Sequence, residues 1–138
     1  MQDAYWTEQV EIQRRVAAAW QTFAQGQKDE GVAQLKAAAD AEDATDKSAI
    51  SPGPIAPARE LLGYMLLEAG HHKEALAAFE ATMKKEPNRF RSTYGAAQAA
   101  ASAGDKAKAR TYYKQLLEIA KEADTDRPEI VAAKAFVK

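Results

Sequence analysis

A short pattern of glycine, alanine and an aromatic residue occurs twice in this chain at a fixed distance. The two copies lie 34 residues apart and consist of Gly70, Ala75 and Phe79, followed by Gly104, Ala109 and Tyr113. A period of roughly 20–50 residues is typical of stacked structural repeats, in which each unit buries its apolar face against its neighbours. Alanine, the best helix former, is abundant, whereas β-branched residues are sparse. The sequence therefore predicts an all-α protein made of stacked helical hairpins.

A weaker third copy precedes these two. It consists of Gly26, Gly31 and Leu35. It begins 44 rather than 34 residues before Gly70, so ten additional residues are expected as an insertion near residues 45–56. A loop beyond about 12–15 residues is usually either functional or disordered, and the prolines in this stretch favour an extended backbone. One interpretation is that the insertion lies across the groove of the repeats, with Ile50 and Ile55 as apolar contacts.

Glycine and proline mark the ends of the expected helices. The hairpin turns are expected at Gly26, Gly70 and Gly104. Glycine adopts the left-handed conformation that ends a helix and lets the chain reverse. Pro87 is expected to end a helix, and Asp126 to cap the last one, with Pro128 in its first turn. We expect helices over residues 4–25, 29–44, 56–69, 73–85, 89–103, 106–123 and 127–137.

These helices predict one domain over residues 1–138. Its parts are hairpins over 1–44, 57–86 and 88–123, an insertion over 45–56 and a capping helix over 127–138. Small residues such as Gly63 let paired helices approach to about 8–10 Å, while Phe79 fills the remaining space. The last helix has Ile130, Ala133 and Phe136 on one side, so we expect it to cover the third hairpin.

The middle repeat resembles the signature of the tetratricopeptide repeat family. The matching residues are Leu62, Gly63, Leu66, Ala75, Phe79 and Pro87, with a weaker match at Ala96, Ala97, Ala109 and Tyr113. Thr82 stands where the family usually has alanine, and Lys121 replaces its closing proline. The chain also resembles the C-terminal repeat segments of uncharacterised bacterial proteins of this family. The resemblance implies a right-handed α-solenoid of three hairpins with a C-terminal capping helix, and a function in protein binding.

Charge and composition argue against several function classes. The formal net charge is −1, which provides no long-range field to attract a nucleic acid. No apolar run reaches the roughly 18 residues needed to cross a membrane, so we expect no membrane partner. The sequence contains no cysteine, which removes thiolate nucleophiles and cysteine zinc sites. The localisation stays open, since a cytoplasmic protein and one exported after removal of a signal peptide would look alike.

Clusters that could support catalysis or bind a metal are weak. His71 and His72 are adjacent, whereas two helical metal ligands usually lie four residues apart, so we interpret them as polar turn residues. The acidic stretch from Asp40 to Asp46 lacks the glycine and glutamate of a calcium loop and is interpreted as a solvated helix end. The prolines of residues 51–54 lack the backbone N–H groups of a phosphate cradle. We expect no enzyme and no cofactor.

The resemblance places the ligand surface on the concave face, formed by the first helix of each hairpin. By alignment, the candidate partner-binding residues are Trp20, Glu60, Tyr64, Leu67, Arg91, Tyr94 and Gln98. Tyrosine, tryptophan and arginine supply many binding hot spots. The competing interpretation is burial in the core, which fits Trp20 and Phe23 best because their helix is apolar over a wide stripe. Arg89 and Arg91 either receive an acidic or phosphorylated segment or are simply solvated.

Two functions agree with these observations. The first is a protein-interaction module that binds a peptide or a neighbouring domain through the concave face. Glu60 and Tyr64 stand where the family's clamp for C-terminal carboxylates has lysine and asparagine, so a chaperone-tail binder is not expected. The alternative is a structural role, in which an incompletely capped repeat surface pairs with a second copy to form a homo-oligomer.

Overall fold

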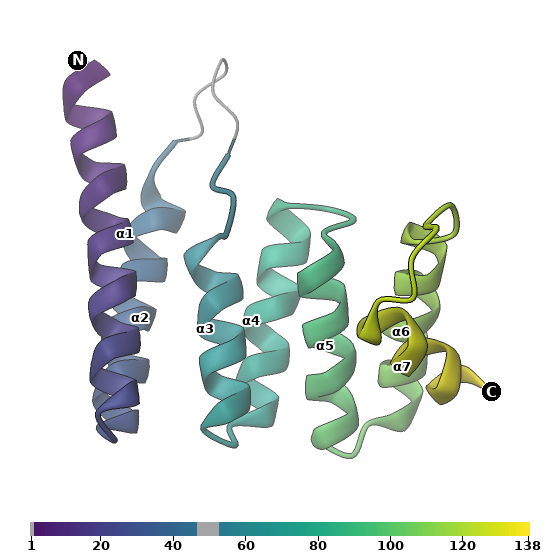
Figure 1. The fold of residues 1–138 in the computed structure, drawn as a ribbon. Coiled ribbons are helices and arrows are strands. Elements are labelled where there is room, and N and C mark those ends of the chain that lie inside the picture. Colours follow the sequence, from purple (N-terminus) through teal and green to yellow (C-terminus); the bar gives the residue numbers. More distant parts are fainter. Residues whose placement is uncertain (1, 47–52) are drawn as a thin grey trace.

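The computed structural model describes residues 2–46 and 53–138, and these residues form seven helices and no strand (Figure 1). The helices are α1 (Gln2–Ala24), α2 (Lys28–Ala44), α3 (Ala58–Glu68), α4 (His72–Lys85), α5 (Phe90–Ser102), α6 (Lys106–Ile119) and α7 (Pro128–Val137). The prediction of an all-α fold is confirmed. The largest difference from the expected helix ends is in α6, which ends at Ile119 instead of residue 123. None of the described helices is long and apolar enough to cross a bilayer.

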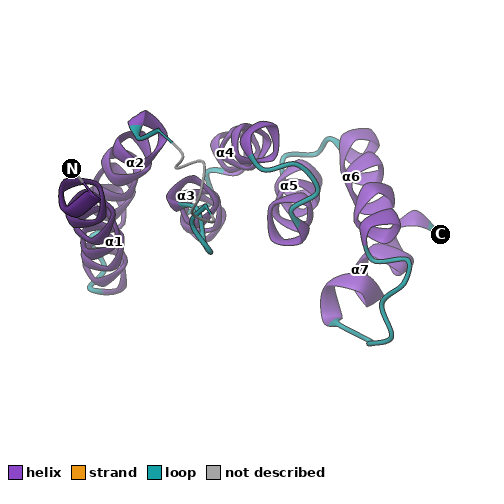
Figure 2. Cartoon of the chain, turned by 90° about the horizontal axis from the view of Figure 1, so that it is seen from above, coloured by secondary structure: helices purple, strands orange, loops and turns teal. Residues whose placement is uncertain are grey.

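The helices form two layers along one row, as expected for an α-solenoid. Helix α1 pairs with α2, α3 with α4, and α5 with α6, and each helix also packs against the one that follows it. Seen from above, α1, α3 and α5 form one layer, and α2, α4 and α6 form the other (Figure 2). The row is bowed, and α7 lies on the same side as α1, α3 and α5, which is the inner side of the bow.

The three glycine turns are confirmed. Gly26, Gly70 and Gly104 have φ angles of 91°, 83° and 87°, in the left-handed region that residues with a side chain rarely occupy. The backbone N–H of His71 donates to the carbonyl oxygen of Leu66 at 2.8 Å, which is the hydrogen bond of a Schellman cap. Each glycine therefore ends the first helix of a hairpin and lets the second run back beside it.

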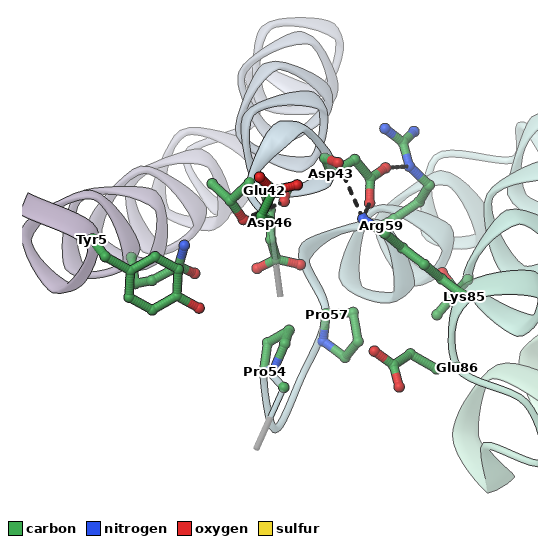
Figure 3. A pocket seen from close by; sticks show the side chains of 13 residues that line it. Tyr5, Glu42, Asp43, Asp46, Pro54, Pro57, Arg59, Lys85 and Glu86 are labelled. Carbon is green, nitrogen blue, oxygen red and sulfur yellow. Dashed lines mark hydrogen bonds and ion pairs between the residues drawn. The ribbon is translucent and has the colours of Figure 1, made fainter. Parts of the chain in front are cut away.

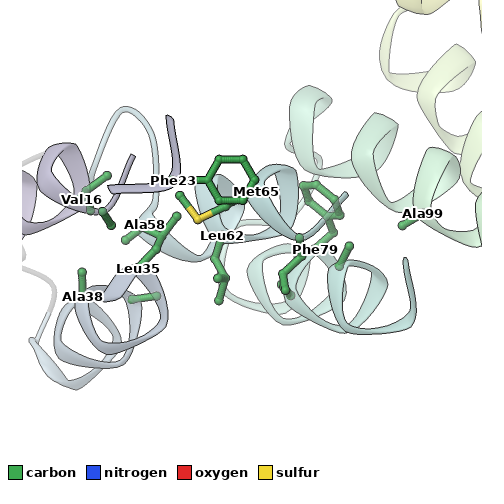
Figure 4. Close-up of a cluster of buried hydrophobic side chains, with 14 of the residues drawn as sticks. Val16, Phe23, Leu35, Ala38, Ala58, Leu62, Met65, Phe79 and Ala99 are labelled. Carbon is green, nitrogen blue, oxygen red and sulfur yellow. The ribbon is translucent and has the colours of Figure 1, made fainter. Parts of the chain in front are cut away.

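Phe79 occupies a slot between α3 and α5 and is completely buried (Figure 4). A Cβ atom added at Gly63 of α3 would lie 2.7 Å from the tip of the Phe79 ring, and one added at Gly95 of α5 would lie 2.3 Å from it. The prediction that Gly63 packs against Phe79 is confirmed. The contribution of Gly95 was not predicted. The Phe79 ring therefore fits between α3 and α5 only because each of these helices has a glycine, which has no side chain, where the ring meets it.

Helix α7 covers the end of the third hairpin, as predicted. Ala133 is fully buried in a cluster with residues of α5 and α6, and Phe136 packs against that cluster. The expected cap at Asp126 is wrong, because the N-cap residue is Arg127 and Pro128 is the first helical residue. Proline disfavours the helical conformation in the residue before it, and Arg127 accordingly has an extended backbone. The helix therefore begins one residue later than the capping pattern indicated.

The expected apolar contact of Ile55 with the groove is also wrong. Its side chain is 94% exposed, and the segment is held instead by its backbone, because Arg89 donates to the Ile55 carbonyl oxygen at 2.6 Å. The companion prediction for Ile50 lies outside the described residues.

Candidate functional site

Helix α5 shows which face of the inner layer is open. It lies between the neighbouring helices α3, α4 and α6, and most of its side chains are buried. Apart from Phe90 at its start, the residues that keep access to solvent form one stripe: Arg91, Tyr94, Gln98, Ala101 and Ser102. In α3 the corresponding stripe contains Tyr64 and Leu67, both half-buried. Both helices lie in the middle of the inner layer, on the inner side of the bow (Figure 2).

A hollow opens on this face where α3, α5 and the start of α7 meet. Its volume is about 270 Å³, and it is lined by Tyr64, Phe90, Arg91, Tyr94, Arg127 and Glu129. Three of the residues that were predicted to bind a partner, Tyr64, Arg91 and Tyr94, are therefore brought together. Phe90, at the start of α5, is a further lining residue that the alignment did not indicate. Arg127 and Glu129 were not predicted either, because they reach the hollow only through the packing of α7 against the third hairpin.

Tyr64 fixes the position of Arg91 in two ways. Its hydroxyl donates to the backbone carbonyl oxygen of Arg91 at 2.7 Å, and the Arg91 guanidinium carbon lies 5.1 Å from the centroid of the Tyr64 ring. A guanidinium over an aromatic face is attracted by the ring quadrupole. Burial raises the pKa of the Tyr64 phenol to about 12, so the hydroxyl stays protonated and remains a donor.

The opposite wall of the hollow is formed by the start of α7. The guanidinium carbon of Arg127 lies 4.7 Å from the centroid of the Phe90 ring, and its Nη2 atom lies 3.1 Å from the Glu129 carboxylate. A backbone hydrogen bond and this guanidinium lower the pKa of Glu129. Burial, together with the nearby Glu129 charge, raises the pKa of the Tyr94 phenol. The hollow thus contains two guanidinium groups and one carboxylate.

The assignment of Glu60 as a partner-binding residue is contradicted by the structure. Its side chain is completely buried, and Arg89 donates to both carboxylate oxygens, at 2.7 and 3.1 Å. The hydroxyl of Ser92 donates to the same carboxylate. A buried charge requires such partners, so Glu60 joins α3 to the start of α5 and has no free face for a ligand. Arg89, which was considered for an acidic segment, is occupied by this ion pair.

The remaining predicted residues lie outside the hollow. Trp20 of α1 is half-buried, and its ring packs edge-on against the buried Phe23 at a centroid distance of 5.8 Å. Leu67 packs partly against the core. Gln98 lies on the open stripe of α5, one helical turn beyond Tyr94. None of these three residues lines the hollow.

A second polar cluster joins α2, α3 and α4 beside another pocket (Figure 3). Asp43, which was interpreted as part of a solvated helix end, accepts hydrogen bonds from both Arg59 and Lys85. Burial alone would raise the pKa of Asp43, but these two bonds outweigh it and lower the pKa. Asp40, three residues earlier on the same face of α2, pairs with Arg59 as well. The spacing of Asp40 and Asp43, which places both carboxylates on one face of a helix, is the feature of the sequence that could have indicated this junction between hairpins.

Glu42 lines the same pocket from α2. Its carboxylate accepts a hydrogen bond from the backbone N–H of Ala58 at 2.7 Å, and burial raises its pKa.

His71, which was considered as a metal ligand, is exposed and lies 3.1 Å from Glu74. Across residues 2–46 and 53–138, no three histidine or acidic side chains form a group that could hold a metal ion.

Comparison with known proteins agrees with the architecture. The sequence profile of the tetratricopeptide repeat family matches residues 66–135. No curated protein sequence matches the chain. The fold is similar to PcrH from Pseudomonas aeruginosa in complex with the chaperone binding region of PopB, with a TM-score of 0.69 and 17% identity over 91% of this chain and 94% of that one.

Two further solved structures share this fold. The PcrH complex with the chaperone binding region of PopD has a TM-score of 0.72 and 16% identity, over 94% of this chain and 90% of that one. The Yersinia enterocolitica type III secretion translocator chaperone SycD, in an alternative dimer, has a TM-score of 0.72 and 12% identity, over 91% and 88%.

Proposed function

The chain belongs to the tetratricopeptide repeat family, and we propose that it is a protein-interaction module that binds a peptide or a neighbouring domain through the concave face of α1, α3 and α5. The observation that carries this proposal is the convergence of Tyr64, Arg91 and Tyr94 in one hollow of that face. The proposed role is non-catalytic, in keeping with the family.

The residue types in the hollow fit protein recognition. Tyrosine and arginine offer a large contact area together with polar atoms. Tyr64 and Arg91 already hold each other in place, so little side-chain freedom is lost on binding. PcrH, which has a similar fold, forms complexes with the chaperone binding regions of PopB and PopD. That similarity supports a segment of another protein as the ligand of this fold.

The proposal is tested with a displayed library of random linear peptides, selected on the immobilised protein. A selected peptide is then titrated into the isotope-labelled protein while the backbone amide signals are followed by nuclear magnetic resonance. We expect the largest shifts in α3 and α5. Shifts concentrated in α4 and α6, on the other layer, or a failure to select any peptide, would contradict a concave-face binding module.

A matched pair of substitutions makes this test independent of the mapping. Gln98→Trp places a bulky ring on the open stripe of α5, whereas Lys114→Trp places the same ring on an exposed position of α6. We expect the affinity for a selected peptide to fall about tenfold or more, or by roughly 1.4 kcal/mol, only in the first variant. An equal effect of both substitutions would argue against the concave face.

A second candidate function is self-association through α1. Trp6 and Val10 lie one turn apart on this helix and are 51% and 68% exposed, and an apolar surface of this kind favours contact with another protein. The test is the mass of the protein in solution at increasing concentration. Self-association predicts a dimer that is lost with Trp6→Gln but kept with Val131→Gln, which changes an equally exposed apolar residue of α7.

A further inference from the structure

We propose that the hollow between α3, α5 and α7 binds an acidic side chain, aspartate or glutamate, of the partner peptide, with Arg91 as its main contact. This inference rests on the proposed function, because it names the chemistry of the segment that the concave face would bind. The argument starts from the charges in the hollow and from the groups that neutralise them.

The Arg91 guanidinium is available to a ligand. The other arginines near it are occupied, since Arg89 is paired with Glu60 and Arg127 with Glu129. Within the described part of the chain, the Arg91 side chain forms no ion pair with a carboxylate. It interacts with the ring and the hydroxyl of Tyr64 and, at longer range, with the charge of Glu129. The residue as a whole is exposed. An unpaired guanidinium therefore faces the hollow.

Tyr64 fixes Arg91 but leaves most of the five N–H donors of its guanidinium free. The Tyr64 hydroxyl holds its backbone at 2.7 Å, and the face of the Tyr64 ring, which contacts the guanidinium, uses none of its N–H groups. The hydroxyl of Tyr64 also interacts with the side chain of Arg91. Two N–H groups on one edge of a guanidinium match the two oxygens of a carboxylate. The Tyr94 hydroxyl, which has no hydrogen bond to another described residue, lines the same hollow and can donate to one of these oxygens.

The charge balance favours a carboxylate over a phosphate. Arg91, Arg127 and Glu129 give the hollow a net charge of +1, which one carboxylate neutralises. A phosphoryl group carries about −1.5 to −2 charges at neutral pH, so it would leave an excess of negative charge beside Glu129.

The inference is tested by the sequences of the peptides selected above and by the affinity of one acidic peptide for four proteins. These are the wild type, Arg91→Gln, Arg91→Glu and the control Arg14→Gln, which removes an exposed arginine of α1. We expect the wild type to enrich peptides that contain aspartate or glutamate. Arg91→Gln should weaken the acidic peptide about 10- to 100-fold, as expected for the loss of a charged hydrogen bond, and Arg14→Gln should not.

Two further measurements test the acidic site without relying on the loss of affinity in Arg91→Gln. Arg91→Glu should enrich peptides that contain lysine or arginine, which simple damage to the fold would not produce. In the wild type, the affinity for the acidic peptide should fall as salt is added, because salt screens an exposed ion pair. Thermal unfolding of each variant checks that it is folded.

The inference and the proposed function can fail separately. If the wild type selects peptides that map to α3 and α5 but carry no excess of acidic residues, the acidic site is overturned and the concave-face module stands. If no peptide maps to the concave face, both are overturned. Tighter binding of a peptide in which phosphoserine replaces the acidic residue would overturn the choice of a carboxylate.

Discussion

Replacing Gly95 by alanine should destabilise the protein, although alanine is the better helix former. The added Cβ atom would lie 2.3 and 2.4 Å from two carbons at the tip of the Phe79 ring, whereas ordinary contact begins at 3.4 Å. The ring is completely buried and cannot retreat freely, because Gly63 of α3 touches the same ring tip. Either Phe79 leaves its position or α5 moves away from α4 by about 1 Å.

The magnitude follows from two opposing effects. Overpacking a core typically costs about 1–3 kcal/mol. The added Cβ atom would lie well inside the ordinary contact distance of a buried ring, so we expect a cost at the upper end of this range. Alanine regains about 1 kcal/mol of helix propensity relative to glycine. We therefore expect a net loss of about 1–2 kcal/mol. For a chain of this length, the loss corresponds to a decrease in Tm of about 3–6 °C.

The assay is thermal unfolding followed by far-ultraviolet circular dichroism, in the wild type and in a Phe79→Leu background. Leucine lacks the ring tip that meets position 95, so Gly95→Ala should be neutral or stabilising in that background. An increase in Tm in the wild-type background would refute the reasoning. So would an equal loss in both backgrounds, which would show that the effect does not pass through Phe79.

Three other substitutions test separate parts of the fold. Ala75→Leu should cost about 1–3 kcal/mol in urea unfolding, because Ala75 is fully buried where two helices approach; an unchanged midpoint would contradict the repeat alignment. Glu60→Ala should cost about 2–3 kcal/mol, because it leaves Arg89 without its carboxylate. A loss of stability smaller than that caused by removing an exposed ion pair would show that this pair does not stabilise the fold. Glu42→Gln should raise Tm at neutral pH, because burial raises the pKa of Glu42, so its ionised form destabilises the fold above that pKa. This gain should disappear as the pH falls to the ordinary glutamate pKa of about 4.3, and a gain that is equal at all pH values would contradict the assignment.

The hairpins were predictable because their signals are local. A glycine that ends a helix acts within one turn of the chain, and the same spacing recurs at Gly70 and Gly104. The slot around Phe79 was only half predicted, since the alignment identified Gly63 but not Gly95. Which residue of α5 meets the ring depends on the rotation of that helix about its axis, and a run rich in small residues leaves that rotation undetermined.

The candidate site shows the same division between local and long-range information. The alignment placed Tyr64, Arg91 and Tyr94 on one face, and the structure brings them to one hollow. It placed Glu60 there as well, but this carboxylate is neutralised by Arg89, which lies 29 residues further along the chain. Neutralisation at that distance depends on how two hairpins meet, so the sequence pattern of a single repeat does not contain it.

The Phe79 slot also determines where this chain can be divided. The sequence repeat suggests a boundary at Pro87, between one hairpin and the next. A fragment that ended there would keep Gly63 but lose Gly95, and it would expose one side of the largest fully buried side chain of the described residues. Burying an aromatic side chain removes roughly 150–250 Å² from water. A division of the chain that keeps this slot intact must therefore leave α3, α4 and α5 together. Recombination of repeats would preserve stability only where the exchanged segment carries both glycines with the ring.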